Sequence, residues 1–207
     1  LTVDNAGELE EAVTAAAEAG ADELFVIHLD VTPSAELRRR AAFGDGELKA
    51  GIDAALERAA AAARRAGIHF RPPSRTTQDL LACALDPRAF ACVGWDGCVG
   101  PCVNLMLPVR GPIPRHTDNG TLQVERTVYG CLEDASLREI LEDDAACRFR
   151  EPFEERQRAE LDFLSSLGGW GTSALERLEE SDREREARLA ANPFPPACRG
   201  CHKMWGW

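Results

Sequence analysis

The stretch Val93-Gly94-Trp95-Asp96-Gly97-Cys98-Val99-Gly100-Pro101-Cys102-Val103 predicts a β-hairpin in the middle of this chain. Its Asp96-Gly97 dipeptide is a two-residue turn signal. Cys83 lies before the hairpin and Cys102 lies just after it. Because the two ends of an antiparallel hairpin lie close together, both thiols can reach one site.

A second cysteine pair, Cys198-Arg199-Gly200-Cys201, has C-x-x-C spacing and adds two thiols on a tight turn. Four thiolates suit either an iron–sulfur cluster or a structural zinc ion. Taken alone, C-x-x-C is a weak signal, and unpaired thiols that pack as small hydrophobic groups are the alternative. The sequence therefore predicts a metal centre only if the fold brings the two pairs together.

Composition and charge narrow the functional classes. The 207 residues include 24 Lys and Arg against 35 Asp and Glu, a net charge of −11. This charge repels polyanions, so we expect no nucleic-acid partner. No apolar run approaches the roughly 20 residues that cross a bilayer, and residues 1–4 do not resemble a signal peptide, so we expect a cytoplasmic protein without a membrane partner. Without a secretion signal, clustering among the eight cysteines favours metal or redox use over a disulfide framework.

Residues 1–75 alternate between strand and helix patterns. The expected elements are a strand at Leu1–Val3, a helix with a capping box at Asn5 and Glu8 that stops at Gly20, a strand at Leu24–Leu29, a helix from Glu47 to about Ala66, and a strand at Ile68–Phe70. The run at 24–29 is continuously apolar, as in a strand buried on both faces. This order predicts a parallel sheet with right-handed crossovers. Three strands would leave an exposed edge, which indicates part of a larger sheet or barrel.

Arg71-Pro72-Pro73-Ser74 marks a boundary, and the pattern changes beyond it. The expected elements are the hairpin, a loop from Arg110 to about Asn119, an irregular strand within 121–129, a helix capped by Ser136, and helices at Glu154–Leu167 and Ser173–Ala191. The helix after Ser136 places Leu137, Ile140 and Leu141 on one apolar face. The charged run Glu179–Arg188 is typical of a solvated helix face.

The hairpin stretch resembles the "wDG-x-v-x-pC" segment of radical S-adenosylmethionine (SAM) enzymes that carry a twitch or SPASM domain. Further segments resemble the family's later motifs and its barrel units, namely Tyr129-Gly130-Cys131-Leu132-Glu133, Ser136-Leu137-Arg138-Glu139-Ile140, Phe149-Arg150, Pro196-Ala197-Cys198-Arg199-Gly200-Cys201, Asn5-Ala6-Gly7-Glu8-Leu9 and Ala19-Gly20-Ala21-Asp22. The resemblance covers most of the chain except about residues 152–192, which look like an insertion.

The resemblance implies an α/β fold class: residues 1–75 as the C-terminal βα units of a partial (β/α) radical SAM barrel, and residues 76–207 as a small α+β twitch/SPASM-like domain. By position, the ligands of one auxiliary [4Fe–4S] cluster would be Cys83, Cys102, Cys198 and Cys201. The SAM-binding C-x3-C-x2-C triplet is not in this sequence. We expect it to precede residue 1, together with a second [4Fe–4S] cluster and SAM.

The implied activity is SAM-dependent radical modification of a peptide, protein or small-molecule substrate, with an electron donor such as ferredoxin or flavodoxin. Asn5 and His28 are candidates to face substrate or SAM, because α/β barrels place catalytic groups at the ends of strands. The alternatives are a non-catalytic zinc- or iron–sulfur-binding module that acts in a complex, and an α/β interaction protein without metal.

The remaining cysteines and histidines are interpreted more simply. Cys92 and Cys98 are expected to be small, half-buried side chains of the hairpin, and Cys131 and Cys147 to be structural. A contact beside the metal centre, without ligation, is the interpretation of His202. His69 and His116 carry no usable signal.

Overall fold

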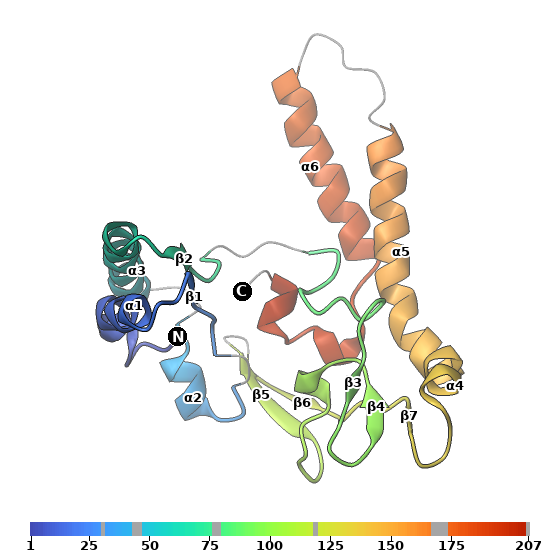
Figure 1. The fold of residues 1–207 in the computed structure, drawn as a ribbon. Coiled ribbons are helices and arrows are strands. Elements are labelled where there is room, and N and C mark those ends of the chain that lie inside the picture. The colour runs from blue at the N-terminus through green and yellow to red at the C-terminus, as the bar shows by residue number, and fades with distance from the viewer. Residues whose placement is uncertain (30–31, 43–46, 76–79, 118–119, 167–173, 206–207) are drawn as a thin grey trace. The chain divides into compact units, whose positions relative to one another are not determined.

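A computed structural model describes residues 1–29, 32–42, 47–75, 80–117, 120–166 and 174–205. The chain divides into two compact units (Figure 1). Among the described residues, unit 1 comprises those within 1–75 and 113–123, and unit 2 those within 80–112 and 124–205. The architecture is mixed α/β with small sheets. Assignment of the units to a radical SAM barrel and a twitch-like domain stays a prediction.

Unit 1 contains two parallel strands and the helices packed beside them. Its elements are η1 (Ala6–Glu8), α1 (Leu9–Glu18), β1 (Glu23–Phe25), α2 (Ala35–Arg40), α3 (Glu47–Ala66), β2 (His69–Arg71), β5 (Ile113–Thr117) and β6 (Gly120–Val124), whose last residue lies in unit 2. Strands β1 and β2 pair in parallel, with Leu24 opposite Phe70. Helices α1 and α3 lie side by side (Figure 1), and Val13 and Ala59 are buried between them. The predicted helix at 47–66 and the β-α-β order with parallel strands are confirmed.

The start of the chain differs from the prediction. Residues 1–3 form no strand; Thr2 makes only an isolated bridge with Ala41. The capping box at Asn5 is also wrong, because Asn5 makes no side-chain cap and its Oδ1 accepts a hydrogen bond from the Thr2 backbone N–H at 2.8 Å. Gly20 ends the helix as expected, at a φ of +76° that favours glycine.

The strand predicted at 24–29 is shorter and less covered than expected. Strand β1 ends at Phe25, and the side chains of Phe25 and Ile27 are 61% and 50% exposed. Leu24 packs against the helices, so only one face of this strand is buried in the chain. The continuous apolar run therefore does not indicate burial on both faces here.

A second departure in unit 1 is the segment expected as a loop at 110–119. Residues 113–117 instead form strand β5, which pairs with β6 in a two-stranded sheet. Thr32 Oγ1 donates a hydrogen bond to the His116 carbonyl at 2.9 Å, and this contact joins β5 to the segment before α2. The irregular strand expected within 121–129 is confirmed only as far as Val124, where β6 ends.

Unit 2 is built on a three-stranded antiparallel sheet with the order β3-β4-β7. Its elements are β3 (Cys92–Val93), β4 (Cys98–Gly100), η2 (Val103–Leu105), β7 (Gly130–Cys131), α4 (Leu137–Glu142), α5 (Asp144–Ser166), α6 (Ala174–Ala191), η3 (Pro196–Cys198) and η4 (His202–Trp205). The predicted hairpin is confirmed, but its loop is one residue longer than expected. Gly94 N–H bonds to the Cys98 carbonyl, and Gly97 takes a positive φ of +73°. This is the three-residue connection in which glycine fills the left-handed position.

The helices of unit 2 agree with the prediction at α6, which spans Ala174–Ala191 against an expected 173–191, and at the cap of α4, but not at the start of α5. Ser136 and Glu139 form a complete capping box at α4, although Leu137 on the predicted apolar face is 44% exposed. Helix α5 begins at Asp144, well before the predicted start at Glu154, and continues through Pro152. Helices α5 and α6 contact each other (Figure 1), and part of the segment between them lies outside the described residues. Among described residues, no helix is long and apolar enough to cross a membrane.

Candidate metal centre

Four tight turns carry the four predicted ligands of the metal centre. In each turn a cysteine carbonyl accepts a hydrogen bond from the backbone N–H three residues later. The pairs are Cys83–Asp86 at 2.9 Å, Cys102–Leu105 at 3.1 Å, Cys198–Cys201 at 2.9 Å and Cys201–Met204 at 2.9 Å. The local structure is thus repeated at sequence-distant positions.

The turns direct backbone N–H groups toward two of the thiols. The N–H groups of Leu85 and Asp86 lower the pKa of the Cys83 thiol, against the larger effect of burial. Those of Leu105 and Asn104 lower the pKa of Cys102 in the same way. Donors to sulfur stabilise the thiolate, which is the form that binds metals. These turns are therefore suited to hold charged sulfur ligands.

All four cysteines meet in one hydrophobic core, which we call the four-cysteine site. Cys198 is buried there, and Cys83, Cys102 and Cys201 pack against the same core as partly buried side chains. The other members of this core are Leu105, Val124, Phe153, Phe194 and Met204, with Ala82, Phe149 and Ala197 packed against it. The structure thus brings the hairpin pair and the C-x-x-C pair into one place.

Burial opposes the charge that a metal ligand must carry. It raises the pKa of the Cys102 thiol to about 11, and the neighbouring Cys201 and Cys83 thiolates raise it further. Burial also raises the pKa of Cys83, to which Cys201 again contributes. A bound multivalent cation would offset both effects, since it neutralises thiolates that otherwise repel one another. The donor set fits a metal centre on chemical grounds.

The spacing of the thiols matters for the kind of centre. Within the part of the chain that the structure describes, no three ligating side chains gather closely enough to hold a single metal ion. A tetrahedral zinc ion with bonds of about 2.3 Å would require sulfur atoms roughly 4 Å apart. A cubane cluster places its four thiolates on separate iron atoms, so its ligands stand farther apart.

Arg156 holds together the segments that lead into the site. Its side chain is 1% exposed, and its guanidinium donates hydrogen bonds to the carbonyls of Leu80, Leu189 and Asn192 at 2.7–2.8 Å. The guanidinium carbon also lies 3.7 Å from the centre of the Phe194 ring. Leu80 precedes Cys83, and Phe194 precedes Cys198. Arg156 therefore positions both cysteine-bearing segments from helix α5.

A cavity of about 400 Å³ opens beside Cys83. It is lined by Leu80, Leu81, Ala82, Cys83, Asp86, Arg88 and Arg185. Both arginines already have acidic partners, Arg88 with Asp86 at 2.7 Å and Arg185 with Glu160 at 2.9 Å. The four-cysteine site is therefore open on the side of Cys83, and the lining of this opening carries little net charge because its arginines are paired with carboxylates.

The two other predicted site residues have structural partners in unit 1. His28 is 4% exposed, and its Nε2 lies 2.7 Å from the Ser74 carbonyl oxygen. Asn5 accepts the Thr2 hydrogen bonds described above. Their assignment to SAM or substrate stays a prediction.

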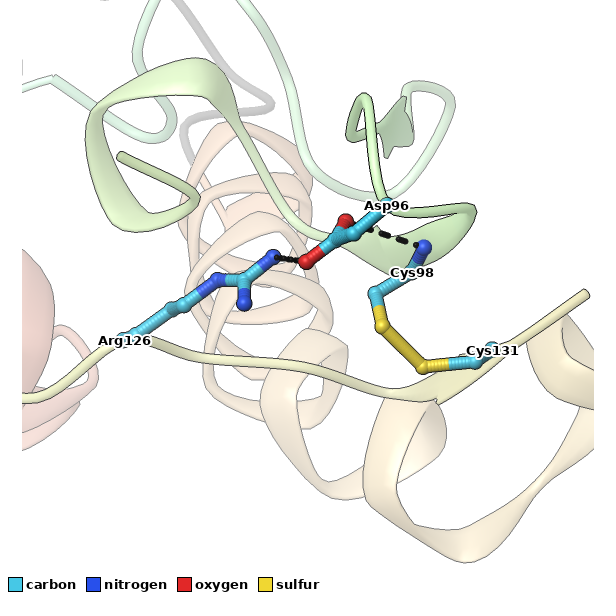
Figure 2. The surroundings of a disulfide bond; sticks show 4 residues. All are labelled: Asp96, Cys98, Arg126 and Cys131. Atoms are coloured by element: carbon cyan, nitrogen blue, oxygen red, sulfur yellow. Dashed lines mark hydrogen bonds and ion pairs between the residues drawn. A yellow bond between two sulfur atoms is a disulfide. The ribbon is translucent and has the colours of Figure 1, made fainter. Parts of the chain in front are cut away.

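A disulfide joins Cys98 to Cys131, as Figure 2 shows, and the sequence did not predict it. Cys98 was expected to be a small, half-buried side chain of the hairpin, and Cys131 to be structural. The two cysteines lie directly opposite each other on the antiparallel strands β4 and β7. Only strand register could have revealed this pairing, because no spacing rule relates residues 98 and 131. Cys147 is an exposed free thiol and Cys92 a half-buried one.

Comparison with known proteins identifies no relative of this chain. The chain matches no model of a protein family, no curated protein and no solved structure.

Proposed function

We propose that this chain binds one auxiliary [4Fe–4S] cluster through Cys83, Cys102, Cys198 and Cys201, and that it forms the C-terminal part of a radical SAM enzyme. The observation that carries the proposal is the convergence of these four thiols, and of no other free cysteine among the described residues, in one core. The resemblance of the sequence to radical SAM enzymes implies the same four residues as cluster ligands.

The residues of the site would support electron transfer. A [4Fe–4S] cluster supplies a one-electron carrier when it is bound. Four protein thiolates would fill every iron position, which leaves no iron open to a substrate. The hydrophobic core shields the buried Cys198 from water, and the backbone N–H groups at Cys83 and Cys102 favour the thiolate form of those two ligands.

Two further features support the radical SAM assignment. The parallel β1–β2 pair with its helices is compatible with βα units of a barrel, and among the described residues these two strands pair only with each other, so their outer edges could be extended by further strands. The triplet that binds the SAM-cleaving cluster is not in the 207 residues, so that cluster would be held outside this sequence. The substrate class would be a peptide, protein or small molecule, and an electron donor such as ferredoxin or flavodoxin would reduce the enzyme.

The second candidate is a non-catalytic zinc- or iron–sulfur-binding module that acts within a complex. The missing triplet favours it. It shares the four-cysteine site and differs in the absence of SAM chemistry.

Metal and sulfide analysis of anaerobically purified protein tests the proposal. We expect a brown protein with absorbance near about 400 nm and roughly four irons and four sulfides per chain. Single Cys→Ala changes at the four sites should each reduce the iron content. Cys147→Ala is the matched control, because it removes an exposed thiol from the same unit. A colourless protein with one zinc per chain would overturn the cluster assignment.

A further inference from the structure

Tyr129 lies on a segment that runs beside the Cys102 turn. The Tyr129 backbone N–H donates to the Val99 carbonyl at 2.7 Å, and the Thr127 N–H donates to the Leu105 carbonyl at 3.0 Å. The two acceptors, Val99 and Leu105, precede and follow Cys102 in the sequence. The approach is close, because a Cβ at Gly100 would clash with the Thr127 carbonyl oxygen. The backbone of Tyr129 is therefore held beside the segment that carries Cys102, and its side chain lies in a second core, with Val99, Ile140 and Ala146, that shares Phe149 with the core of the four-cysteine site.

The hydroxyl of Tyr129 has no hydrogen-bond partner among the described residues, although it is buried. The residue as a whole is 8% exposed. An unsatisfied buried hydroxyl is costly and rare in folded proteins, so its position needs an explanation.

The surroundings of the hydroxyl point to the cysteines. The Tyr129 ring packs edge-on against Phe149 with 5.9 Å between the ring centres, and Phe149 also packs against the core that holds the four cysteines. Burial raises the pKa of Tyr129; Arg150 opposes this change, whereas the thiolates of Cys102 and Cys198 add to it. The phenol thus stays protonated at neutral pH and lies within the electrostatic reach of two thiolates.

We propose that the Tyr129 hydroxyl donates a hydrogen bond to a sulfur atom of the bound cluster or of its cysteine ligands. This inference rests on the proposed function. The hydrogen bond would stabilise the reduced cluster more than the oxidised one, because reduction adds negative charge at the sulfurs. Tyr129 would then raise the reduction potential of the cluster and give the unsatisfied hydroxyl its partner.

The test is Tyr129→Phe in the full 207-residue chain, reconstituted with iron and sulfide. We expect a lower, more negative midpoint potential in a redox titration followed by electron paramagnetic resonance. We also expect the loss of one exchangeable-proton coupling to the reduced cluster when protein in H2O and D2O is compared. Tyr129 is the only tyrosine in the chain, so a phenolic signal has one source. An unchanged potential together with an unchanged proton coupling would overturn the inference.

Two controls isolate the effect of the Tyr129 hydroxyl on the cluster. Thr127→Val removes a hydroxyl from the same segment that bonds to the Glu125 carbonyl, and it should leave the potential unchanged. In the metal-free chain, Tyr129→Phe should unfold at the same or a higher urea concentration, because it deletes an unsatisfied group. A clear loss of metal-free stability would overturn the inference by showing a protein partner for the hydroxyl.

The failure of this inference can be told apart from the failure of the proposed function. Wild-type protein that takes up no iron would overturn both. An iron-loaded wild type whose Tyr129→Phe variant is indistinguishable from it would overturn this inference alone.

Discussion

Arg126 donates a hydrogen bond from Nη2 to Asp96 Oδ2 at 2.6 Å and thereby ties the hairpin loop to the segment that leads into β7 (Figure 2). The second oxygen of Asp96 accepts a hydrogen bond from the Cys98 backbone N–H at 3.2 Å. One carboxylate therefore shapes the loop and holds it against the neighbouring segment. The Arg126 guanidinium keeps the pKa of Asp96 below its ordinary value.

Replacing Asp96 by Asn should lower the stability of unit 2 at neutral pH and remove part of its acid sensitivity. Because the folded pKa of Asp96 is depressed, its contribution is present above the unfolded pKa of about 4 and is lost as the pH falls through the folded value. Urea unfolding at pH 7 and at pH 3 measures both effects. The matched control is Glu142→Gln, which breaks a solvent-exposed pair with Arg138 and should cost only about 0.3–0.5 kcal/mol. Equal losses for the two variants would contradict this role of Asp96.

The disulfide between Cys98 and Cys131 joins β4 to β7 across a sequence separation of 33 residues. Cross-links of this kind stabilise mainly by restricting the unfolded chain. Reduction with dithiothreitol should therefore lower the free energy of unfolding by about 2–4 kcal/mol. A Cys98→Ser, Cys131→Ser double variant should match the reduced wild type and show no further response to the reductant. A response of the double variant would assign the effect to another pair of cysteines.

The parts of the fold that the sequence predicted are those fixed by local chemistry. The helix at Glu47–Ala66 and the Ser136 capping box depend on residues within a few positions of one another, and both form as expected. The short strand β1 and the exposed Phe25 depend on what lies across the sheet, which a local apolar run does not determine.

The same distinction applies to the candidate site. Cys83, Cys102, Cys198 and Cys201 were selected by resemblance, and the fold supplies their shared core. Arg156 has no sequence signal, and Tyr129 stands in the sequence only as part of a segment that resembles a family motif, because a buried arginine and a buried phenol look ordinary until tertiary contacts surround them. The Cys98–Cys131 pair likewise depends on strand register alone.

Replacing Arg156 by Ala should be strongly destabilising. It would remove the guanidinium donor from the carbonyls of Leu80, Leu189 and Asn192, of which Leu189 keeps the Asn192 N–H, and we expect this loss together with the buried packing to cost about 3 kcal/mol or more. Lysine should not rescue the loss, because it cannot reproduce the planar array of donors. Thermal unfolding measures the change, and Arg138→Ala, on an 84% exposed side chain, is the control. A change at Arg156 no larger than the control would contradict the positioning role.

The metal-free chain should lose stability as the pH rises from about 9 to about 11. The folded pKa of Cys102 is raised to about 11 from an ordinary value of 9.0, so the unfolded chain releases the thiol proton first. The contribution of Cys102 is therefore full below pH 9 and lost through pH 11, an effect of at most about 2–3 kcal/mol. Urea unfolding across this range should show a shallower decline for Cys102→Ala than for the wild type. Cys147→Ala should follow the wild type, and parallel curves for all three proteins would contradict the raised pKa.

Removing the proposed cluster should loosen the turns of the four-cysteine site before the helices of unit 1. The free energy of metal binding stabilises the part of the fold that brings the ligands together. Here η3 contains Cys198, and Cys201 directly precedes η4. Hydrogen exchange should therefore speed up at the Cys201 and Met204 amides, which close the two turns of the C-x-x-C segment. The amide of Ala59, in the buried part of α3, is the internal reference and should keep its rate. Equal exchange at residues 196–205 with and without metal would show that the turns hold their shape without it.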